Sequence, residues 1–301
     1  MRRALVVGAS GLVGYHVAKE LKEKGWWVSG TWKTNDPAKN PLLHAAGLDQ
    51  WGQIDLAANL RAGIDQMFKA AVPDLVVMCA AFPNVSECER LVMRCHRENR
   101  MTPTVVAQAA GALRSQFVFL SSGYIFGGGK SEYTEMDLPG INCDAGNTVY
   151  GDDKHHAEVG VMGTCPHALI VRTVGVYGQD PGNKCFSSRL VGSLKAGERF
   201  GFDGSSVSNW TWAPDLARDI VELVEERRSG IVHSAGAVQD RKTFALDVVD
   251  AFNLDATLLD DAVTDTTVPR PHRCVLRTVR PGAQAIHALS NAHGLLDLEV
   301  K

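Results

Sequence analysis

The stretch Ala4-Leu5-Val6-Val7-Gly8-Ala9-Ser10-Gly11-Leu12-Val13-Gly14 lies close to the N-terminus and decides the fold. Its apolar run reads as a strand, its glycines are spaced G-x-x-G-x-x-G, and the apolar residues that follow recur at helical spacing. In such a strand–turn–helix unit, one glycine makes the tight turn, another lets the main chain approach a pyrophosphate, and a third lets the helix pack on the strand. The helix N-terminus adds unpaired N–H groups and a partial positive charge. We therefore expect a dinucleotide phosphate site made by Gly8, Ser10, Gly11, Leu12, Val13 and Gly14; a glycine-rich turn without a ligand is the alternative.

Apolar runs with helical segments between them continue along the chain. Further predicted strands are Trp26–Val28, Leu75–Cys79, Phe117–Leu120 and Leu169–Val171. Their continuous apolar character is typical of parallel strands covered on both faces, so the pattern predicts a doubly wound, Rossmann-type α/β sheet. After about residue 176 the alternation of apolar runs and helical segments becomes less regular. We expect a dinucleotide-binding domain over residues 1–176 and a smaller C-terminal α/β substrate domain over 177–301, part of which returns to the sheet near 205–235.

Composition excludes several classes of protein. The chain has 301 residues, of which 45% are hydrophobic and 22% charged, and its net charge of −3 argues against nucleic-acid and membrane-surface binding. It has seven cysteines and no C-x-x-C, which indicates neither a metal site nor a disulfide framework and favours a reducing compartment. We find no signal peptide and no run of ~20 apolar residues, and expect a cytoplasmic protein without membrane spans. The sequence leaves open whether the chain forms a homodimer.

The end of the second predicted strand bears on the choice of cofactor. An acid that binds the adenosine ribose is expected about 20 residues after the glycines. Here Ser29 to Thr34 contains no carboxylate, and Lys33 offers a positive charge. This pattern favours NADPH over NADH, because the 2′-phosphate of NADPH would pair with Lys33. NADH remains possible. The alternative for Lys33 is a solvated charge in a surface loop.

Tyr150 and Lys154 are four residues apart near the start of a predicted helix, so their side chains share one face. A phenol titrates near pH ~10 and needs a neighbouring cation to act as an acid or base near neutrality. Ser122 lies at the carboxyl end of the strand that includes Phe117–Leu120, where open α/β sheets bind their ligands. We expect Tyr150 to donate a proton, Lys154 to tune it, and Ser122 to hydrogen-bond a substrate carbonyl. An exposed tyrosine–lysine pair and a turn-forming serine are the alternatives.

Four segments together resemble the extended short-chain dehydrogenase/reductases, and within them the dTDP-4-dehydrorhamnose reductase family. They are Leu120–Phe126, Val149–Glu158, Arg172–Gly178 and Arg270–Leu276. The resemblance implies that Asp55, Leu56, Cys79, Ala80 and Ala81 line the adenosine and ribose side of the cofactor, with Asn99 behind it. It also implies contacts of Tyr150 and Lys154 with the cofactor, and NADPH-dependent reduction of a keto group on a nucleotide-linked sugar.

The chain departs from this family on the substrate side. The residues expected there are Ser122, Gly123, Tyr124, Gly175, Trp212 and Arg270. Gly123 replaces an Asp of the family beside the substrate, and Gly175 replaces a Trp. Trp210 and Trp212 either fill the resulting space or belong to the core.

Two alternatives to a ketosugar reductase stay open. The same catalytic residues would serve a nucleotide-sugar epimerase. The chain is also similar to the regulatory β subunit of methionine adenosyltransferase, notably over Asp250–Leu254 and the segment through Pro271. That resemblance implies a non-catalytic, NADP-binding partner protein.

Overall fold

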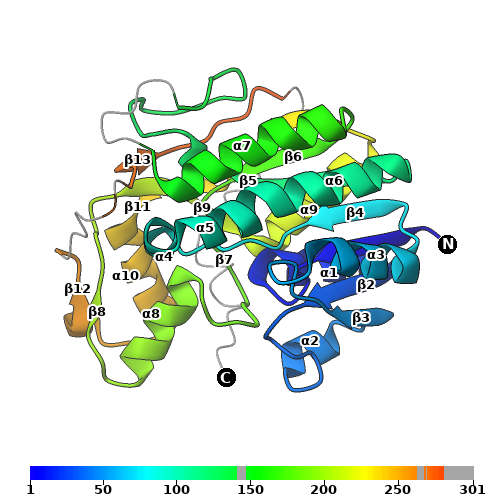
Figure 1. The fold of residues 1–301 in the computed structure, drawn as a ribbon. Coiled ribbons are helices and arrows are strands. Elements are labelled where there is room, and N and C mark those ends of the chain that lie inside the picture. Colours follow the sequence, from blue (N-terminus) through cyan, green and yellow to red (C-terminus); the bar gives the residue numbers. More distant parts are fainter. Residues whose placement is uncertain (141–146, 263–267, 269, 281–301) are drawn as a thin grey trace.

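A computed structural model describes residues 1–140, 147–262, 268 and 270–280. Its centre is a seven-stranded sheet in the order β10-β6-β5-β4-β1-β2-β3, in which every neighbouring pair is parallel (Figure 1). The strands are β1 (Arg3–Val7), β2 (Trp27–Trp32), β3 (Gln50–Gln53), β4 (Leu75–Met78), β5 (Gln116–Ser122), β6 (Leu169–Thr173) and β10 (Gly230–His233). The predicted doubly wound parallel sheet is confirmed, and the edge strands β3 and β10 are additions that the apolar runs did not indicate.

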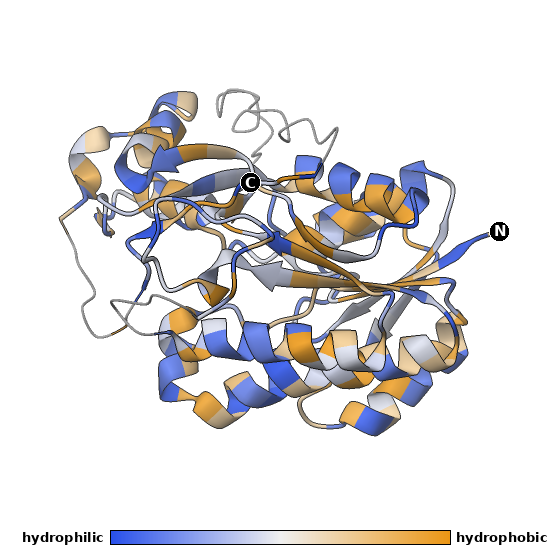
Figure 2. Cartoon of the chain, turned by 90° about the horizontal axis from the view of Figure 1, so that it is seen from above, coloured by the Kyte–Doolittle hydropathy of each residue, from blue (hydrophilic) through white to orange (hydrophobic). Residues whose placement is uncertain are grey.

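Helices cover both faces of this sheet, so its strands are apolar on both sides (Figure 2). Alternate strand residues face opposite helices, as the two-residue period of a strand requires. Ala4 and Val6 lie in one core with α1 (Leu12–Glu23) and α9 (Ala213–Glu225). Leu5 and Val7 lie in the other, with α3 (Leu60–Ala71), α6 (Thr102–Ala112) and α7 (Val149–Thr164). Among the helices of the described ranges, none combines the length and apolar character that crossing a bilayer requires.

The remaining elements either build a second, smaller core or connect the sheet strands. The other helices are α2 (Pro41–Ala45), α4 (Val85–Arg90), α5 (Val92–Cys95), the π-helix η1 (His96–Met101), the 3-10 helices η2 (Gly123–Ile125) and η3 (Ala256–Leu258), α8 (Phe186–Lys195) and α10 (Arg241–Ala251). The other strands are β7 (Val176–Tyr177), β8 (Phe200–Gly201), β9 (Val207–Trp212), β11 (Ala237–Asp240), β12 (Leu259–Asp260) and β13 (Arg273–Cys274). The second core lies between α8, α10 and β9, where Trp210 stacks on Phe244 with ring centroids 3.7 Å apart (Figure 1).

The path of the chain fixes where a ligand can bind. After β9, the chain returns to the large sheet through α9 and β10, which pairs with β6. Within the large sheet, β1 is followed by a helix on one face, whereas β4 leads to helices on the other face. Such a reversal opens a crevice beyond the carboxyl ends of β1 and β4, the position at which doubly wound sheets bind nucleotides. The glycine turn after β1 therefore lies at this crevice.

Candidate cofactor and active site

The three glycines of the turn after β1 serve different purposes. Gly8 has φ +85°, and a Cβ on it would lie 2.7 Å from the Ala80 nitrogen. A Cβ on Gly14 would lie 2.2 Å from the Gly8 oxygen. A Cβ on Gly11 would make only an ordinary contact, 3.5 Å from that same oxygen. The fold thus requires glycine at the first and third positions, whereas at Gly11 the fold leaves room that an approaching ligand can use.

The N-terminus of α1 begins at this free position. Its N-cap residue is Gly11, which has no side chain to accept hydrogen bonds from the first turn, and no acidic residue lies in that turn. Leu12 and Val13, the first helical residues, therefore present their N–H groups toward the crevice without a capping side chain. Ser10 is held from the loop after β2, because its carbonyl oxygen accepts a hydrogen bond of 3.2 Å from Asn35 Nδ2. This combination of a small cradle and an uncapped helix fits the pyrophosphate of a dinucleotide.

The predicted adenosine-side residues come from the loops that follow β2, β3 and β4. Cys79 and Ala80 continue from β4, and their backbone nitrogens bond the Val7 oxygen at 2.9 and 2.8 Å. Burial raises the pKa of Cys79 to about 12, and its side chain packs partly buried against the core of the sheet. Leu56 packs partly buried on the core of that face, and Ala81 follows Ala80 at the same edge.

Lys33 follows β2 directly and pairs with two carboxylates. Its Nζ lies 3.1 Å from Asp55 Oδ1 and 3.4 Å from Glu98 Oε1. Desolvation acts to raise the pKa of Asp55, but the hydrogen bond and charge of Lys33 outweigh it and hold that pKa below its usual value. The ion pair between Lys33 and Asp55 therefore connects the loop after β2 to the loop after β3. The sequence located Lys33 and Asp55 but missed Glu98, which carries no signal in its local sequence.

Asn99 supports the loop after β4. Its side chain is fully buried in η1, accepts a hydrogen bond from the Phe82 nitrogen at 2.8 Å and donates to the Phe82 oxygen at 2.9 Å. Its Nδ2 also lies 3.2 Å from the Cys95 sulfur. Asn99 thus fixes the shape of the loop that follows β4.

Ser122, Tyr150 and Lys154 come together at the carboxyl end of β5. Lys154 is almost fully buried, and its Nζ donates to the Leu120 oxygen at 2.7 Å and lies 6.0 Å from the Tyr150 ring centroid. Ser122 hydrogen-bonds the Tyr150 phenol. The Ser122 Oγ also accepts from the Tyr124 nitrogen at 3.2 Å. Three groups from two segments, the end of β5 and the start of α7, therefore form one assembly.

Burial shifts both titrating groups of this assembly. It raises the pKa of Tyr150, against which the hydrogen bond from Ser122 acts, so the phenol is protonated at neutral pH. It lowers the pKa of Lys154 to about 8, against which the charge of Glu158 acts. Near pH 7 the site therefore holds a phenol able to donate a proton and an ammonium able to stabilise the resulting phenolate.

A buried ion pair supports this assembly from below, and the sequence did not predict its role. Glu158 and Arg172 pair bidentately, with Nε to Oε1 at 2.9 Å and Nη2 to Oε2 at 2.7 Å. The Ser121 hydroxyl donates to Glu158 at 2.5 Å. Because an unpaired buried charge is strongly unfavourable, this pair fixes α7 against β5 and β6 and hence positions Tyr150 over the strand end. Both residues lie in segments that carried the family resemblance, which was the only available signal.

Gly123 faces the C-terminal segment of the described chain. A Cβ on Gly123 would lie 2.7 Å from the Cys274 sulfur and 3.4 Å from Leu276 Cδ2. Both residues are buried. The place of a side chain at position 123 is therefore taken by residues of β13 and the segment that follows it.

Gly175 is required by the main chain. It has φ +58°, and a Cβ on it would lie 2.0 Å from the Asn209 oxygen. Trp210 belongs to the second core, as its stacking on Phe244 shows. Trp212 is half-buried against the same core, and the Arg218 guanidinium lies 5.9 Å from the centroid of its ring. The open question about the tryptophans is thus resolved for Trp210, which is a core residue.

Tyr124 brings two arginines to the substrate side. Its ring lies edge-on to that of Tyr150, with centroids 6.1 Å apart. Burial raises the pKa of Tyr124, against which the nearby charges of Arg241 and Arg270 act, together with a hydrogen bond from Arg241. Arg270 also donates to Ser86 Oγ at 2.5 Å. Arg241, the first residue of α10, was missed because nothing in its local sequence distinguishes it from a surface arginine.

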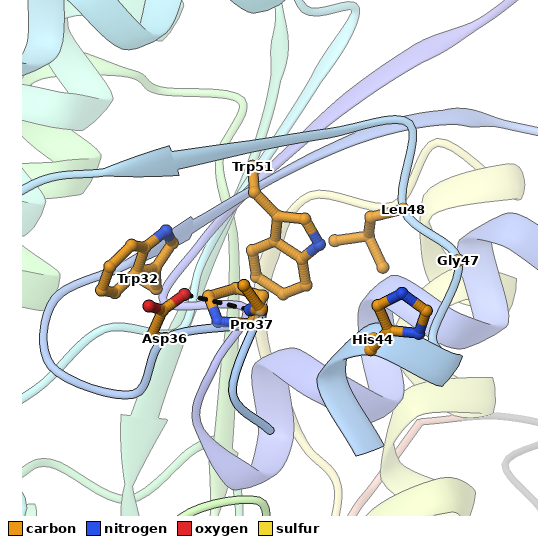
Figure 3. Close-up of a pocket in the computed structure, with 8 residues that line it drawn as sticks. Trp32, Asp36, Pro37, His44, Gly47, Leu48 and Trp51 are labelled. Atoms are coloured by element: carbon orange, nitrogen blue, oxygen red, sulfur yellow. Dashed lines mark hydrogen bonds between the residues drawn. The ribbon is translucent and has the colours of Figure 1, made fainter. Parts of the chain in front are cut away.

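A pocket of 360 Å³ lies on the outer side of the loop after β2 (Figure 3). Trp32, Pro37 and Trp51 form its aromatic and apolar part, and Leu48 and His44 face them (Figure 3). The Asp36 carboxylate bonds the Ala38 nitrogen at 3.0 Å. The pocket shares the β2 loop with the glycine turn and contains none of the predicted site residues.

Comparison with known proteins finds a matching family model, relatives and solved structures of the same fold. A family model described as the RmlD substrate binding domain matches residues 1–290. The chain is 28% identical over 285 residues to the "Probable low-salt glycan biosynthesis reductase Agl14" of Haloferax volcanii, covering 91% of this chain and 89% of that protein. It is 29% identical over 285 residues to methionine adenosyltransferase 2 subunit beta of Xenopus tropicalis, covering 90% and 78%. A solved dTDP-4-dehydrorhamnose reductase from Bacillus anthracis in complex with NADP shares the fold, with a TM-score of 0.75 at 20% identity over 92% of this chain and 91% of that one.

Proposed function

The chain belongs to the family of the RmlD substrate binding domain, and from this premise we propose that it is an NADPH-dependent reductase of a keto group on a nucleotide-linked sugar. Membership confirms the resemblance that the sequence motifs predicted. The observation that carries the proposal is the assembly of Ser122, Tyr150 and Lys154 at the strand end beside the glycine turn. A serine, a protonated phenol and a buried cation are the groups that carbonyl reduction needs.

The residues of the crevice fit a dinucleotide. The cradle at Gly11 and the uncapped start of α1 would hold the pyrophosphate. Lys33 would face the 2′-phosphate of the adenosine ribose. The solved dTDP-4-dehydrorhamnose reductase of the same fold that is in complex with NADP supports this choice of cofactor. When bound, a reduced nicotinamide supplies a hydride.

The chain's own residues would manage the proton. Ser122 donates a hydrogen bond to the carbonyl oxygen and polarises it, and Tyr150 then donates its phenolic proton to that oxygen. The charge of Lys154 stabilises the phenolate that remains. Lys154 can do so because its Nζ is fixed by the Leu120 oxygen and lies close to the ring. Burial of the assembly keeps the phenol protonated until a substrate is present.

The test is oxidation of NADPH by the purified chain with dTDP-4-keto-6-deoxyglucose, run beside Tyr150→Phe. We expect turnover that Tyr150→Phe lowers at least about a thousandfold, with NADPH affinity retained. Tyr133→Phe is the matched control, because the Tyr133 phenol stacks on Phe126 and accepts a hydrogen bond from the Lys130 nitrogen, whereas it makes no described hydrogen bond to Ser122, Tyr150 or Lys154. Activity that survives in Tyr150→Phe would refute the assignment of the proton donor. Conversion of the sugar without net oxidation of NADPH would indicate an epimerase.

A regulatory subunit is the second candidate, and the packing at Gly123 favours it. Cys274 and Leu276 occupy the position from which a side chain would face the substrate. A relative of similar identity is named as a subunit of methionine adenosyltransferase. This candidate predicts NADPH binding without turnover of nucleotide ketosugars, together with a stable complex with a methionine adenosyltransferase chain in gel filtration.

A further inference from the structure

Four charged side chains from three segments meet at the adenosine side of the crevice. Lys33 pairs with Asp55 and Glu98, and Arg94 Nε donates to the same Glu98 oxygen at 2.9 Å. The Arg94 guanidinium in turn lies 4.1 Å from the centroid of the Phe82 ring. The two cations and two anions sum to a formal charge of zero. The positive charge that Lys33 offers in the sequence is therefore neutralised in the folded chain.

This neutralisation opposes a 2′-phosphate. Lys33 follows β2 directly, which is the position from which the fold distinguishes a ribose hydroxyl from a ribose phosphate. A phosphate brought to Lys33 would also approach the carboxylates of Asp55 and Glu98, and it carries negative charge like theirs. Each ion pair is partly exposed, so the repulsion that each carboxylate exerts on the phosphate is modest. Both repulsions weaken binding of the 2′-phosphate. NADH lacks the phosphate and is not subject to this repulsion.

Glu98 is the carboxylate that is free to act as the determinant. Asp55 Oδ1 also accepts hydrogen bonds from the Ala57 and Ala58 nitrogens at 2.9 and 3.3 Å, so it holds the turn after β3. The hydrogen bonds described for Glu98 come from the two cations alone. Its side chain is 16% exposed against 43% for Asp55, so solvent screens its charge less. The wide turn of η1 that presents Glu98 also presents Asn99 to the Phe82 loop.

We propose that Glu98 sets the cofactor preference of this chain. Its carboxylate holds Lys33 and Arg94, weakens binding of the 2′-phosphate and so keeps the affinities for NADPH and NADH close to each other. This inference rests on the proposed dinucleotide site and adds the residue that decides between the two dinucleotides.

The test is direct binding to the full-length chain. Dissociation constants of NADPH and NADH are measured from their fluorescence, and those of adenosine 2′,5′-bisphosphate and 5′-AMP by calorimetry. For Glu98→Gln we expect NADPH and the bisphosphate to bind about tenfold more tightly, with less than about twofold change for NADH and 5′-AMP. Glu226→Gln is the matched control, since it makes the same charge change in an exposed ion pair with Arg228. Lys33→Ala should show the opposite effect, weakening only the ligands that carry the 2′-phosphate.

Three results would overturn the inference. An unchanged ratio of affinities in Glu98→Gln would mean that the carboxylate does not oppose the phosphate. Weaker NADPH binding in that variant would mean that Glu98 positions Lys33 for the phosphate instead of withholding it. Failure of the wild type to bind either dinucleotide would overturn the proposed function along with the inference, whereas the first two results leave the proposed function standing.

Discussion

Replacing Gly11 by Ala separates what the fold needs from what the cofactor needs. The N-cap conformation of Gly11, φ −96° and ψ 170°, is extended backbone that alanine adopts without strain. A Cβ there would lie 3.5 Å from the Gly8 oxygen, an ordinary contact. Alanine also lowers the entropy of the unfolded chain, which stabilises the fold by ~0.4–1 kcal/mol and offsets its weakness as an N-cap. We therefore expect the free energy of unfolding to stay within about 0.5 kcal/mol of the wild type.

The effect on the cofactor should be much larger. The added methyl group would stand where the pyrophosphate must approach the N–H groups of the first turn of α1. Hydrogen bonds to charged groups contribute about 1.5–3 kcal/mol each, so losing one of them weakens NADPH binding by about thirtyfold, or ~2 kcal/mol. NADPH fluorescence titration and urea unfolding measure the two quantities on the same sample.

Alanine substitutions at two other glycines serve as controls for the effects of Gly11→Ala on stability and on NADPH binding. Gly14→Ala should destabilise the fold by ~3 kcal/mol or more, because its Cβ would lie 2.2 Å from the Gly8 oxygen. Gly163→Ala, in the last turns of α7, meets no atom within 4 Å and should change neither quantity strongly. If Gly11→Ala bound NADPH as tightly as the wild type, the pyrophosphate site would not be at this turn, and the reasoning from the free position would be refuted.

Three further outcomes follow from the site and its surroundings. Because the pKa of Lys154 is about 8, kcat/KM for reduction should fall as the pH rises through about 8, and a flat profile to pH 10 would exclude its charge from the reaction. Gly123→Ala should destabilise the fold by ~1–3 kcal/mol, and Cys274→Ala should relieve much of that loss in a double-mutant cycle because the clash is with its sulfur. Burial lowers the pKa of His16 from 6.5 to about 4, so the unfolded chain binds the extra proton between these values. Its contribution to stability should fall by about 3 kcal/mol as the pH drops through that window, and urea unfolding of His16→Gln should show a shallower decline.

The sequence was sufficient for the centre of the sheet, and the reason is physical. The strands β1, β4, β5 and β6 are covered on both faces, so each leaves a continuous apolar run that can be recognised without any partner. The edge strands are different. In β3, Gln50–Gln53 contributes polar residues and a glycine, and only pairing with β2 makes it a strand. Strand β10 lies on the far edge, within the stretch near 205–235 that we expected to return to the sheet, but its four residues alone did not indicate its exact position.

The meeting of Ser122, Tyr150 and Lys154 was predictable for a similar reason. Tyr150 and Lys154 are fixed by one helical turn, and Ser122 ends a strand, so local geometry plus the rule for strand ends brings them together. Glu98 shows where this reasoning stops. It reaches Lys33 from a helix 65 residues away in sequence, and only the fold shows that the two meet. A residue whose effect depends on a partner from another loop leaves no pattern of its own.

Gly123 and Gly175, the two glycines that we expected on the substrate side, pack against one connected unit of the fold. The Asn209 main chain excludes a side chain at Gly175, because a Cβ on Gly175 would lie 2.0 Å from the Asn209 oxygen. A larger residue at this position requires β9 to lie farther away. At Gly123 the obstacle is Cys274, whose segment also pairs with β9 through β13. Asn209 ties the two places together, because its carbonyl opposes Gly175 while its side chain accepts from the Leu276 nitrogen at 2.8 Å. An Asp at position 123 or a Trp at position 175 would therefore clash with this packed unit. Room for a side chain at either position requires residues 207–212 and 273–276 to move, and the Asn209 hydrogen bond makes them move together.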